Sequence, residues 1–95
     1  MQEKIYEYDS EIYEASQKGG AYVKFPYDVR EEFQAGRVKV HVEFDGEPYD
    51  GSVVNMGVKN PDGSICYIIG IRKEIRAKIK KQTGDTVHIK VTPRF

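Results

Sequence analysis

The sequence has 95 residues, of which 39% are hydrophobic and 32% are charged, and its formal net charge is zero. This is the composition of one soluble globular domain, so we treat residues 1–95 as a single domain. A neutral chain excludes a whole-molecule attraction to nucleic acid or to acidic membranes. The apolar runs are far shorter than the roughly 20 residues needed to cross a bilayer, so we expect no membrane contact.

Two features of the sequence favour a cytoplasmic protein. The N-terminal residues contain no apolar segment of the kind found in signal peptides, and the one cysteine, Cys66, cannot form an internal disulfide. Phosphate-binding glycine loops and dinucleotide-binding motifs are absent from the sequence, so no cofactor is expected.

The first third of the chain predicts two strands and a short helix. Residues 4–15 place Tyr and Ile side chains on one parity and acidic side chains on the other, as a half-buried strand does. Residues 21–25 form a second strand with the same alternation. Asp28 followed by Glu31 predicts a capping box at the start of a helix, and Gly36 is the expected end of that helix.

A hairpin is predicted next. Residues 37–44 are the clearest strand because apolar and polar side chains alternate without a break. Asp45 and Gly46 then predict a type I′ turn, since both central positions of that turn need a positive φ. Pro48 and Gly51 mark the return strand as an edge strand or a kinked one.

The second half of the chain begins with a tight turn at residues 60–63. Residues 65–69 are apolar on both faces, which predicts a central or covered strand. A helix is expected over residues 72–82 and is ended by Gly84, and a last strand runs over 86–92. The apolar stripe of this helix consists of Ile71, Ile75 and Ile79.

The two halves of the chain repeat the same order of elements. Residues 21–42 and residues 66–91 each read as a strand, a short helix, a glycine and an alternating strand. This repeat predicts a mainly β fold in which two similar halves close one small barrel around a pseudo-twofold axis, with a short helix capping each end. The predicted core residues are Val29, Phe33, Val38, Val40, Val42, Ile75, Ile79, Val87, Ile89 and Val91.

The sequence also resembles known families. Gly84-Asp85 before an alternating strand resembles the Gly-Asp box of cradle-loop barrels, including AbrB/MazE-type domains. A second set of residues runs along nearly the whole chain, namely Gly20-Ala21-Tyr22-Val23, Pro26, Asp28-Val29, Val38, Val40, Asp45-Gly46, Gly57, Ile71-Arg72-Lys73, Ile75-Arg76 and Gly84-Asp85-x-Val87. In these residues the chain resembles the bacterial family catalogued as domain of unknown function 1905. That resemblance implies a double-split, cradle-loop-like β-barrel within one chain, and it implies no activity.

The predicted second helix is strongly basic and is a candidate binding site. Residues 72–81 carry six Lys or Arg side chains and one Glu. One hypothesis is a phosphate-contacting surface for nucleic acid. The alternative, which we favour, is a solvated helix whose cations lie near its negative C-terminal end. The residues that the nucleic-acid hypothesis assigns to phosphate contact are Arg72, Lys73, Arg76 and Lys80.

Catalytic and metal sites are not indicated. His41 and His88 occupy polar positions of their strands without the further ligands that a metal needs, so we expect surface histidines and no metal. Cys66 lies in an apolar run, which predicts a buried and unreactive thiol. Carboxylates with the spacing of a catalytic acid and base are not found either, so we expect that the protein is not an enzyme.

The leading hypothesis is a non-catalytic binding or interaction module of unknown partner. Seven tyrosines and no tryptophan suit either strand residues with buried rings, a protein-binding surface or the mouth of a ligand site. Nucleic-acid binding through residues 72–81 and small-molecule binding at the barrel mouth are the alternatives. Because the repeat predicts a chain that closes its own barrel, we expect a monomer or a weak homodimer.

Overall fold

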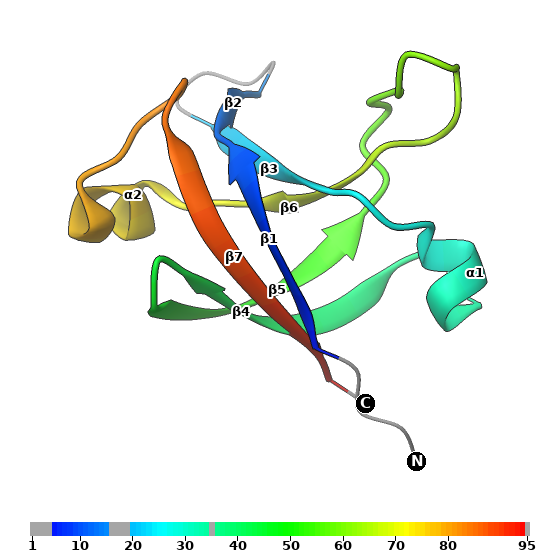
Figure 1. The fold of residues 1–95 in the computed structure, drawn as a ribbon, viewed down its shortest axis with the longest axis horizontal. Helices are drawn as coiled ribbons and strands as arrows, with labels where there is room; N and C mark the ends of the chain where they lie inside the picture. The colour runs from blue at the N-terminus through cyan, green and yellow to red at the C-terminus, as the bar shows by residue number, and fades with distance from the viewer. Residues whose placement is uncertain (1–4, 16–19, 35, 95) are drawn as a thin grey trace.

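The computed structural model describes residues 5–15, 20–34 and 36–94. In these ranges the protein is mainly β, and seven strands form one antiparallel sheet that curves into a nearly closed barrel with two short helices on opposite sides (Figure 1). Among the described helices none is long and apolar enough to cross a membrane. The elements are β1 (Tyr6–Glu11), β2 (Tyr13–Glu14), β3 (Ala21–Phe25), α1 (Val29–Phe33), β4 (Val38–Phe44), β5 (Glu47–Val54), β6 (Tyr67–Gly70), α2 (Lys73–Ile79) and β7 (Thr86–Pro93).

One bent segment supplies both edges of the sheet. The strand order is β1-β7-β4-β5-β6-β3-β2, so β1 and β2 lie at opposite ends of the order although they are consecutive in sequence. Ile12 separates them, donating its N–H to the Asp85 carbonyl (2.9 Å) and accepting from the Gly84 N–H (2.8 Å). Between β1 and β3 the Lys24 N–H donates to Ser10 Oγ at 3.2 Å. The barrel therefore closes at a bend held by the turn before β7.

The strand predicted over residues 4–15 is consequently divided at Ile12, and its first residue, Lys4, lies outside the described residues. The predicted parity is confirmed, since Tyr6 and Ile12 are buried while Glu7 is exposed. The alternation of apolar and polar side chains shows which side of a strand faces the core. It cannot show a bend when the buried positions continue in the same alternation across it.

α1 starts where predicted, but it ends earlier, and its capping box is incomplete because the described residues include no hydrogen bond from the Asp28 N–H to the Glu31 side chain. Asp28 is the N-cap, and its Oδ1 accepts from the N–H groups of Arg30 (3.0 Å) and Glu31 (3.3 Å). The predicted end at Gly36 is wrong, because Gln34 already adopts the left-handed conformation, with φ 56°. The Gln34 N–H donates to the Arg30 carbonyl (2.8 Å), which satisfies one of the last helical carbonyls.

The second helix is likewise shorter than the predicted range 72–82. It ends at Ile79, and Lys80 adopts the left-handed conformation with φ 58°, so the prediction that Gly84 ends it is wrong. Gly84 does have a positive φ of 98°, but it uses this conformation in the turn that bonds to Ile12. Gly84 does not end the helix, but with Asp85 it forms the tight turn before the last strand that the sequence also predicts, where Asp85 Oδ2 accepts from the Gln82 N–H at 2.9 Å.

The β4–β5 hairpin follows the prediction. Asp45 (φ 51°) and Gly46 (φ 89°) both have positive φ, as a type I′ turn requires. β5 pairs with β4 along nearly its whole length, but with β6 only through Val53 and Val54, so its first part is an edge. A β-carbon at Gly51 would lie 2.7 Å from the ring of the neighbouring Tyr49, so any other residue there would require that ring to move.

The core fills the interior of the barrel. All the predicted core positions on β4 and β7 are buried, as are Val29 and Ile75, whereas Phe33 and Ile79 are partly buried at the margin. The other core residues, which the predicted core does not include, come from β1, β3, β5 and β6, from the last position of β4, and from the positions that directly follow β1 and β6. These further core residues are Tyr6, Ile12, Ala21, Val23, Phe25, Phe44, Val53, Tyr67, Ile69 and Ile71.

Ile12→Ala tests the closure of the barrel. The Ile12 side chain is fully buried, so truncation leaves a cavity at the bend and is expected to cost about 2–5 kcal/mol in unfolding free energy. Ile5→Ala is the matched control, because the Ile5 side chain is 53% exposed and its loss should change stability by less than about 0.5 kcal/mol. Urea denaturation measures both. Equal midpoints for the two variants would contradict a closure that depends on Ile12.

Candidate functional site

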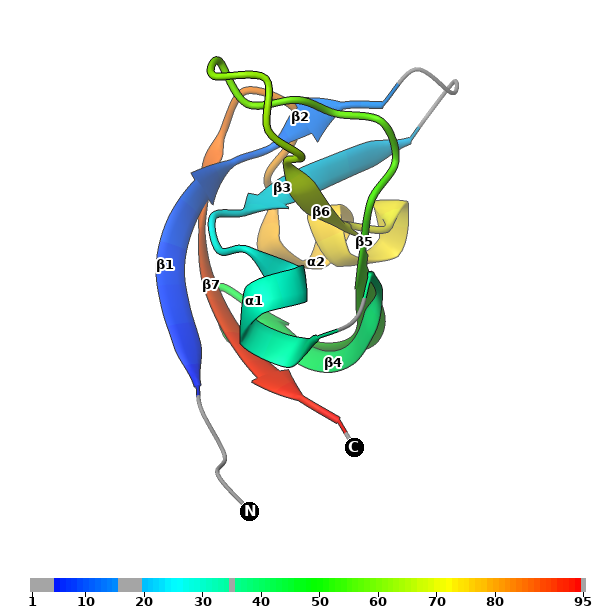
Figure 2. The ribbon, with the colours of Figure 1, turned by 90° about the vertical axis from the view of Figure 1, so that its right-hand side faces the viewer.

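A hairpin-like arm, residues 58–66, projects from the barrel on the α1 side (Figure 2). Its sides are joined by a bridge between Lys59 and Ile65. Its tip is the predicted tight turn, in which the Gly63 N–H donates to the Asn60 carbonyl at 2.9 Å and Gly63 has φ 88°. These hydrogen bonds give the arm a defined shape although it lies outside the strands of the barrel.

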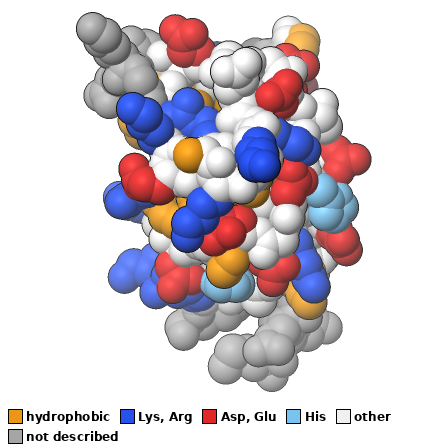
Figure 3. All heavy atoms as spheres, turned by 90° about the vertical axis from the view of Figure 1, so that its left-hand side faces the viewer, with side chains coloured by type: hydrophobic (Ala, Val, Ile, Leu, Met, Phe, Trp, Pro, Cys, Tyr) orange, Lys and Arg blue, Asp and Glu red, His pale blue; other side chains and the backbone are white. Residues whose placement is uncertain are grey.

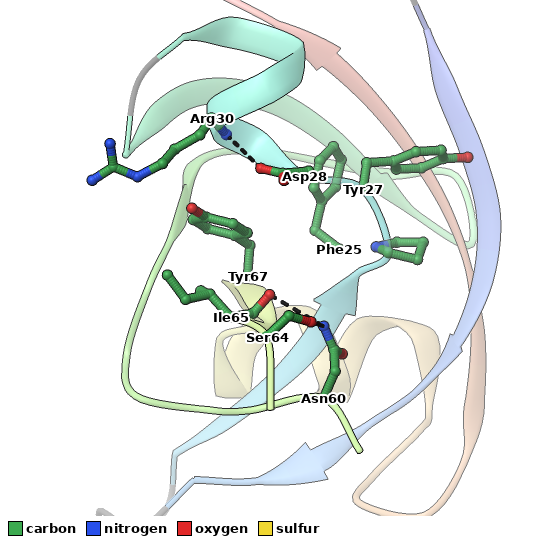
Figure 4. A pocket seen from close by; sticks show the side chains of 9 residues that line it. Phe25, Tyr27, Asp28, Arg30, Asn60, Ser64, Ile65 and Tyr67 are labelled. Carbon is green, nitrogen blue, oxygen red and sulfur yellow. Dashed lines mark hydrogen bonds between the residues drawn. The ribbon is translucent and has the colours of Figure 1, made fainter. Parts of the chain in front are cut away.

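A pocket of about 440 Å³ lies between the arm and the junction of β3 with α1 (Figure 4). Phe25 and Tyr67 form its aromatic floor, and they are partners across the β3–β6 pair at this end of the barrel. Paired strands thus hold the floor, while a helix start and the arm form the walls. The wall residues are Pro26, Tyr27, Asp28, Arg30, Asn60, Ser64 and Ile65.

The polar groups of the pocket are only partly used by the protein. Asn60 Nδ2 donates to Ser64 Oγ (3.0 Å) and to the Ile65 carbonyl (3.2 Å), which fixes the amide and leaves Asn60 Oδ1 available. The Arg30 guanidinium and the Tyr67 hydroxyl make no hydrogen bond or ion pair to any described residue. The pocket therefore offers both donors and acceptors over an apolar floor.

The structure brings the predicted nucleic-acid contacts together in two adjoining grooves beside α2. Lys73 and Arg76 line both grooves. Lys80 lines the first, of about 470 Å³, and Arg72 lines the second, of about 410 Å³. These four side chains therefore lie on one side of the barrel, even though α2 is shorter than predicted.

Acidic neighbours reduce the positive charge of this side. Lys81 Nζ lies 2.6 Å from Asp45 Oδ2, and Lys78 Nζ lies 3.5 Å from Glu47 Oε2. Burial alone would raise the pKa of Asp45, but the hydrogen bonds from Lys81 and from the His88 N–H outweigh burial and hold it below its usual value. On the side that carries α2, Lys and Arg alternate with Asp and Glu (Figure 3).

The β1–β7 pair creates a charge cluster that sequence reasoning missed. His88 lies between two carboxylates of β1, with Nε2 2.7 Å from Glu7 Oε2 and Nδ1 2.7 Å from Asp9 Oδ1. Only the protonated imidazolium can donate from both nitrogens, so two carboxylate partners favour the protonated form. The hydrogen bond to Glu7 raises the pKa of His88 most, and the hydrogen bond to Asp9 raises it further. The sequence does place Glu7, Asp9 and His88 on the polar faces of the first and last strands. It does not give the register that brings these side chains together.

The other side chains considered for catalysis or metal binding lie apart. His41 Nδ1 is 2.8 Å from Oδ1 of its cross-strand partner Asp50. Cys66 is buried, and burial raises the pKa of its thiol. Within residues 5–15, 20–34 and 36–94, no group of three or more His, Cys, Asp or Glu side chains is arranged to hold a metal ion.

His88→Gln should lower stability in a pH-dependent way. A pKa raised by folding adds stability that is complete below the unfolded value of about 6.5 and is lost as pH rises through the folded value. The variant should therefore lose more stability at about pH 6 than at about pH 9. Urea midpoints measure this, with His41→Gln, which removes a contact to one carboxylate instead of two, as the control. An equal loss of stability at both pH values would show that Glu7 and Asp9 do not raise the pKa of His88.

Comparison with known proteins identifies the family and not a function. The family described as Domain of unknown function (DUF1905) matches residues 8–91, a range that runs from β1 to β7 and includes the pocket and both basic grooves. A comparison with curated proteins gives no match. The match spans most of the chain, and the chain therefore belongs to the DUF1905 family.

Proposed function

We propose that this domain is a non-catalytic binding module and that its ligand is a small molecule held between the arm and α1. The observation that carries the proposal is the aromatic floor of Phe25 and Tyr67 in a pocket of about 440 Å³. Ligand sites in proteins typically enclose about 300–1,000 Å³ and combine apolar walls with a few fixed polar groups. Since both floor residues belong to paired strands, the site exists before a ligand arrives.

The chemistry of the pocket supports binding without catalysis. Among the described residues, those that line the pocket include no His or Cys. The Ser64 hydroxyl donates to Asp62 Oδ1 at 2.6 Å, within the turn of the arm, so it serves the shape of the arm. Asp28 is the N-cap of α1. Among the described residues that line the pocket, none pairs a nucleophile with a histidine base of the kind that activates it.

Indole, a neutral aromatic probe, tests the pocket. Its addition should shift the backbone amide NMR signals of residues 25–30 and 60–67, because the aromatic floor lies between these segments. Ser64→Trp places an indole ring at the exposed rim and should weaken binding at least about tenfold. Thr83→Trp, at an exposed position outside the pocket lining, is the matched control. Shifts centred elsewhere, or unchanged by Ser64→Trp, would refute this function.

Nucleic-acid binding is a second candidate because four cationic side chains converge on the adjoining grooves beside α2. Phosphate contacts by these side chains would release counterions, so affinity would fall steeply with salt. The ion pairs of Lys78 and Lys81 lower the available charge, and this places the candidate second.

Lys73→Gln with Lys80→Gln tests that candidate. Fluorescence anisotropy with a single-stranded oligonucleotide should show weaker binding and a salt slope reduced by about one unit per lysine that contacts phosphate. Lys39→Gln, an exposed lysine on β4, is the control and should leave the slope unchanged. Absence of binding at low salt would remove nucleic acid from consideration.

We also infer that the barrel is of the double-split, AbrB/MazE-like type and arose by duplication within the chain. The support is that β3 pairs with β6 and β4 pairs with β7, both antiparallel, while α1 follows β3 and α2 follows β6. These are the pairings that a pseudo-twofold axis between the halves would generate. A self-closed barrel favours a monomer or weak homodimer, and the single cysteine favours the cytoplasm.

A further inference from the structure

We propose that the pocket beside α1 selects a small zwitterion, namely a free amino acid with an apolar or aromatic side chain. This inference rests on the proposed function and adds the chemical class of the ligand. It is carried by two opposite charges that border one aromatic floor and that do not neutralise each other.

The two charges are Asp28 and Arg30, at the start of α1. Residues two apart on a helix do not face each other, and no ion pair joins these two side chains. In Figure 4 the Asp28 carboxylate lies beside the gap between Phe25 and Tyr67, while the Arg30 guanidinium lies beyond the hydroxyl end of Tyr67. The pocket thus presents a negative and a positive group at different positions.

Both groups are available to a ligand. Asp28 uses Oδ1 to cap α1, which orients the carboxylate and leaves its second oxygen without a partner among the described residues. The Arg30 guanidinium has no partner in the described parts of the chain. The Tyr67 hydroxyl near this guanidinium and Asn60 Oδ1 across the pocket add a donor and an acceptor.

A ligand with one charge would meet one favourable and one unfavourable group in this pocket. An anion bound at Arg30 leaves the carboxylate of Asp28 without a partner, and a cation bound at Asp28 leaves the guanidinium of Arg30 without one. A zwitterion satisfies both at once, with its ammonium toward Asp28 and its carboxylate toward Arg30. The apolar floor of Phe25 and Tyr67 then covers the side chain, and the volume of about 440 Å³ leaves room for a large one.

Three probes with the same aromatic body test the selection, namely phenylalanine, 2-phenylethylamine and 3-phenylpropionate. Amide NMR titrations of the wild-type protein should show phenylalanine binding at least about tenfold more tightly than either singly charged probe, because a hydrogen bond to a charged group contributes about 1.5–3 kcal/mol. Indole is titrated in parallel as the neutral probe.

Two conservative variants test which side chain recognises which charge of the ligand. Arg30→Gln should remove the preference for phenylalanine over 2-phenylethylamine. Asp28→Asn retains an N-capping side chain and should remove the preference over 3-phenylpropionate without unfolding α1. Arg37→Gln, an exposed arginine outside the pocket lining, is the control and should leave all three affinities unchanged.

The outcomes separate this inference from the proposed function. Equal binding of the three probes, with shifts confined to the pocket, would overturn the zwitterion and retain the binding site. Phenylalanine binding that survives both Arg30→Gln and Asp28→Asn would also overturn it. No pocket shift from phenylalanine, from either singly charged probe or from indole would overturn both the inference and the proposed function.

Discussion

The structure depends on the bend at Ile12, which lets one segment of chain form both edges of the sheet. The bend is anchored to the turn before β7, where Gly84 and Asp85 exchange two backbone hydrogen bonds with Ile12. Asp85 Oδ2 also accepts from the Gln82 N–H at 2.9 Å, so the anchoring turn is itself fixed. β2 pairs with β3 at the far end of the sheet, and β3 pairs with β6 in the barrel wall. Phe25 and Tyr67, the partners at one end of the β3–β6 pair, form the pocket floor.

The two helices give the two sides of the barrel different chemistry. Beside α2 the surface is charged, and part of that charge is paired, as the Lys81–Asp45 contact shows. Both sides are hollowed, but only the pocket beside α1 combines two buried aromatic residues with polar atoms that lack partners among the described residues. A pocket that combines apolar walls with unused hydrogen-bonding groups is the stronger indication of ligand binding, because such groups can fix the orientation of a ligand.

Local signals in the sequence predicted the strands, both tight turns and the core positions on β4 and β7, because side-chain parity and turn chemistry act within a few residues. The helix ends were mispredicted because Gln34 and Lys80 adopt the left-handed conformation, which costs a non-glycine residue about 1–2 kcal/mol and is set by the path of the chain. The pocket floor and the His88 cluster could not be predicted, because each depends on the register between strands far apart in sequence. The basic side chains lie close together because one short segment carries them.

The central claim is that the pocket beside α1 is formed before any ligand binds, with the arm as a rigid wall. Backbone ¹⁵N relaxation of the ligand-free protein tests this claim most directly. If the hydrogen bonds of the arm hold it in place, residues 58–66 should have order parameters near 0.85, like those of the barrel strands. Order parameters below about 0.6 along the arm would contradict the account, because the pocket would then lack one of its walls.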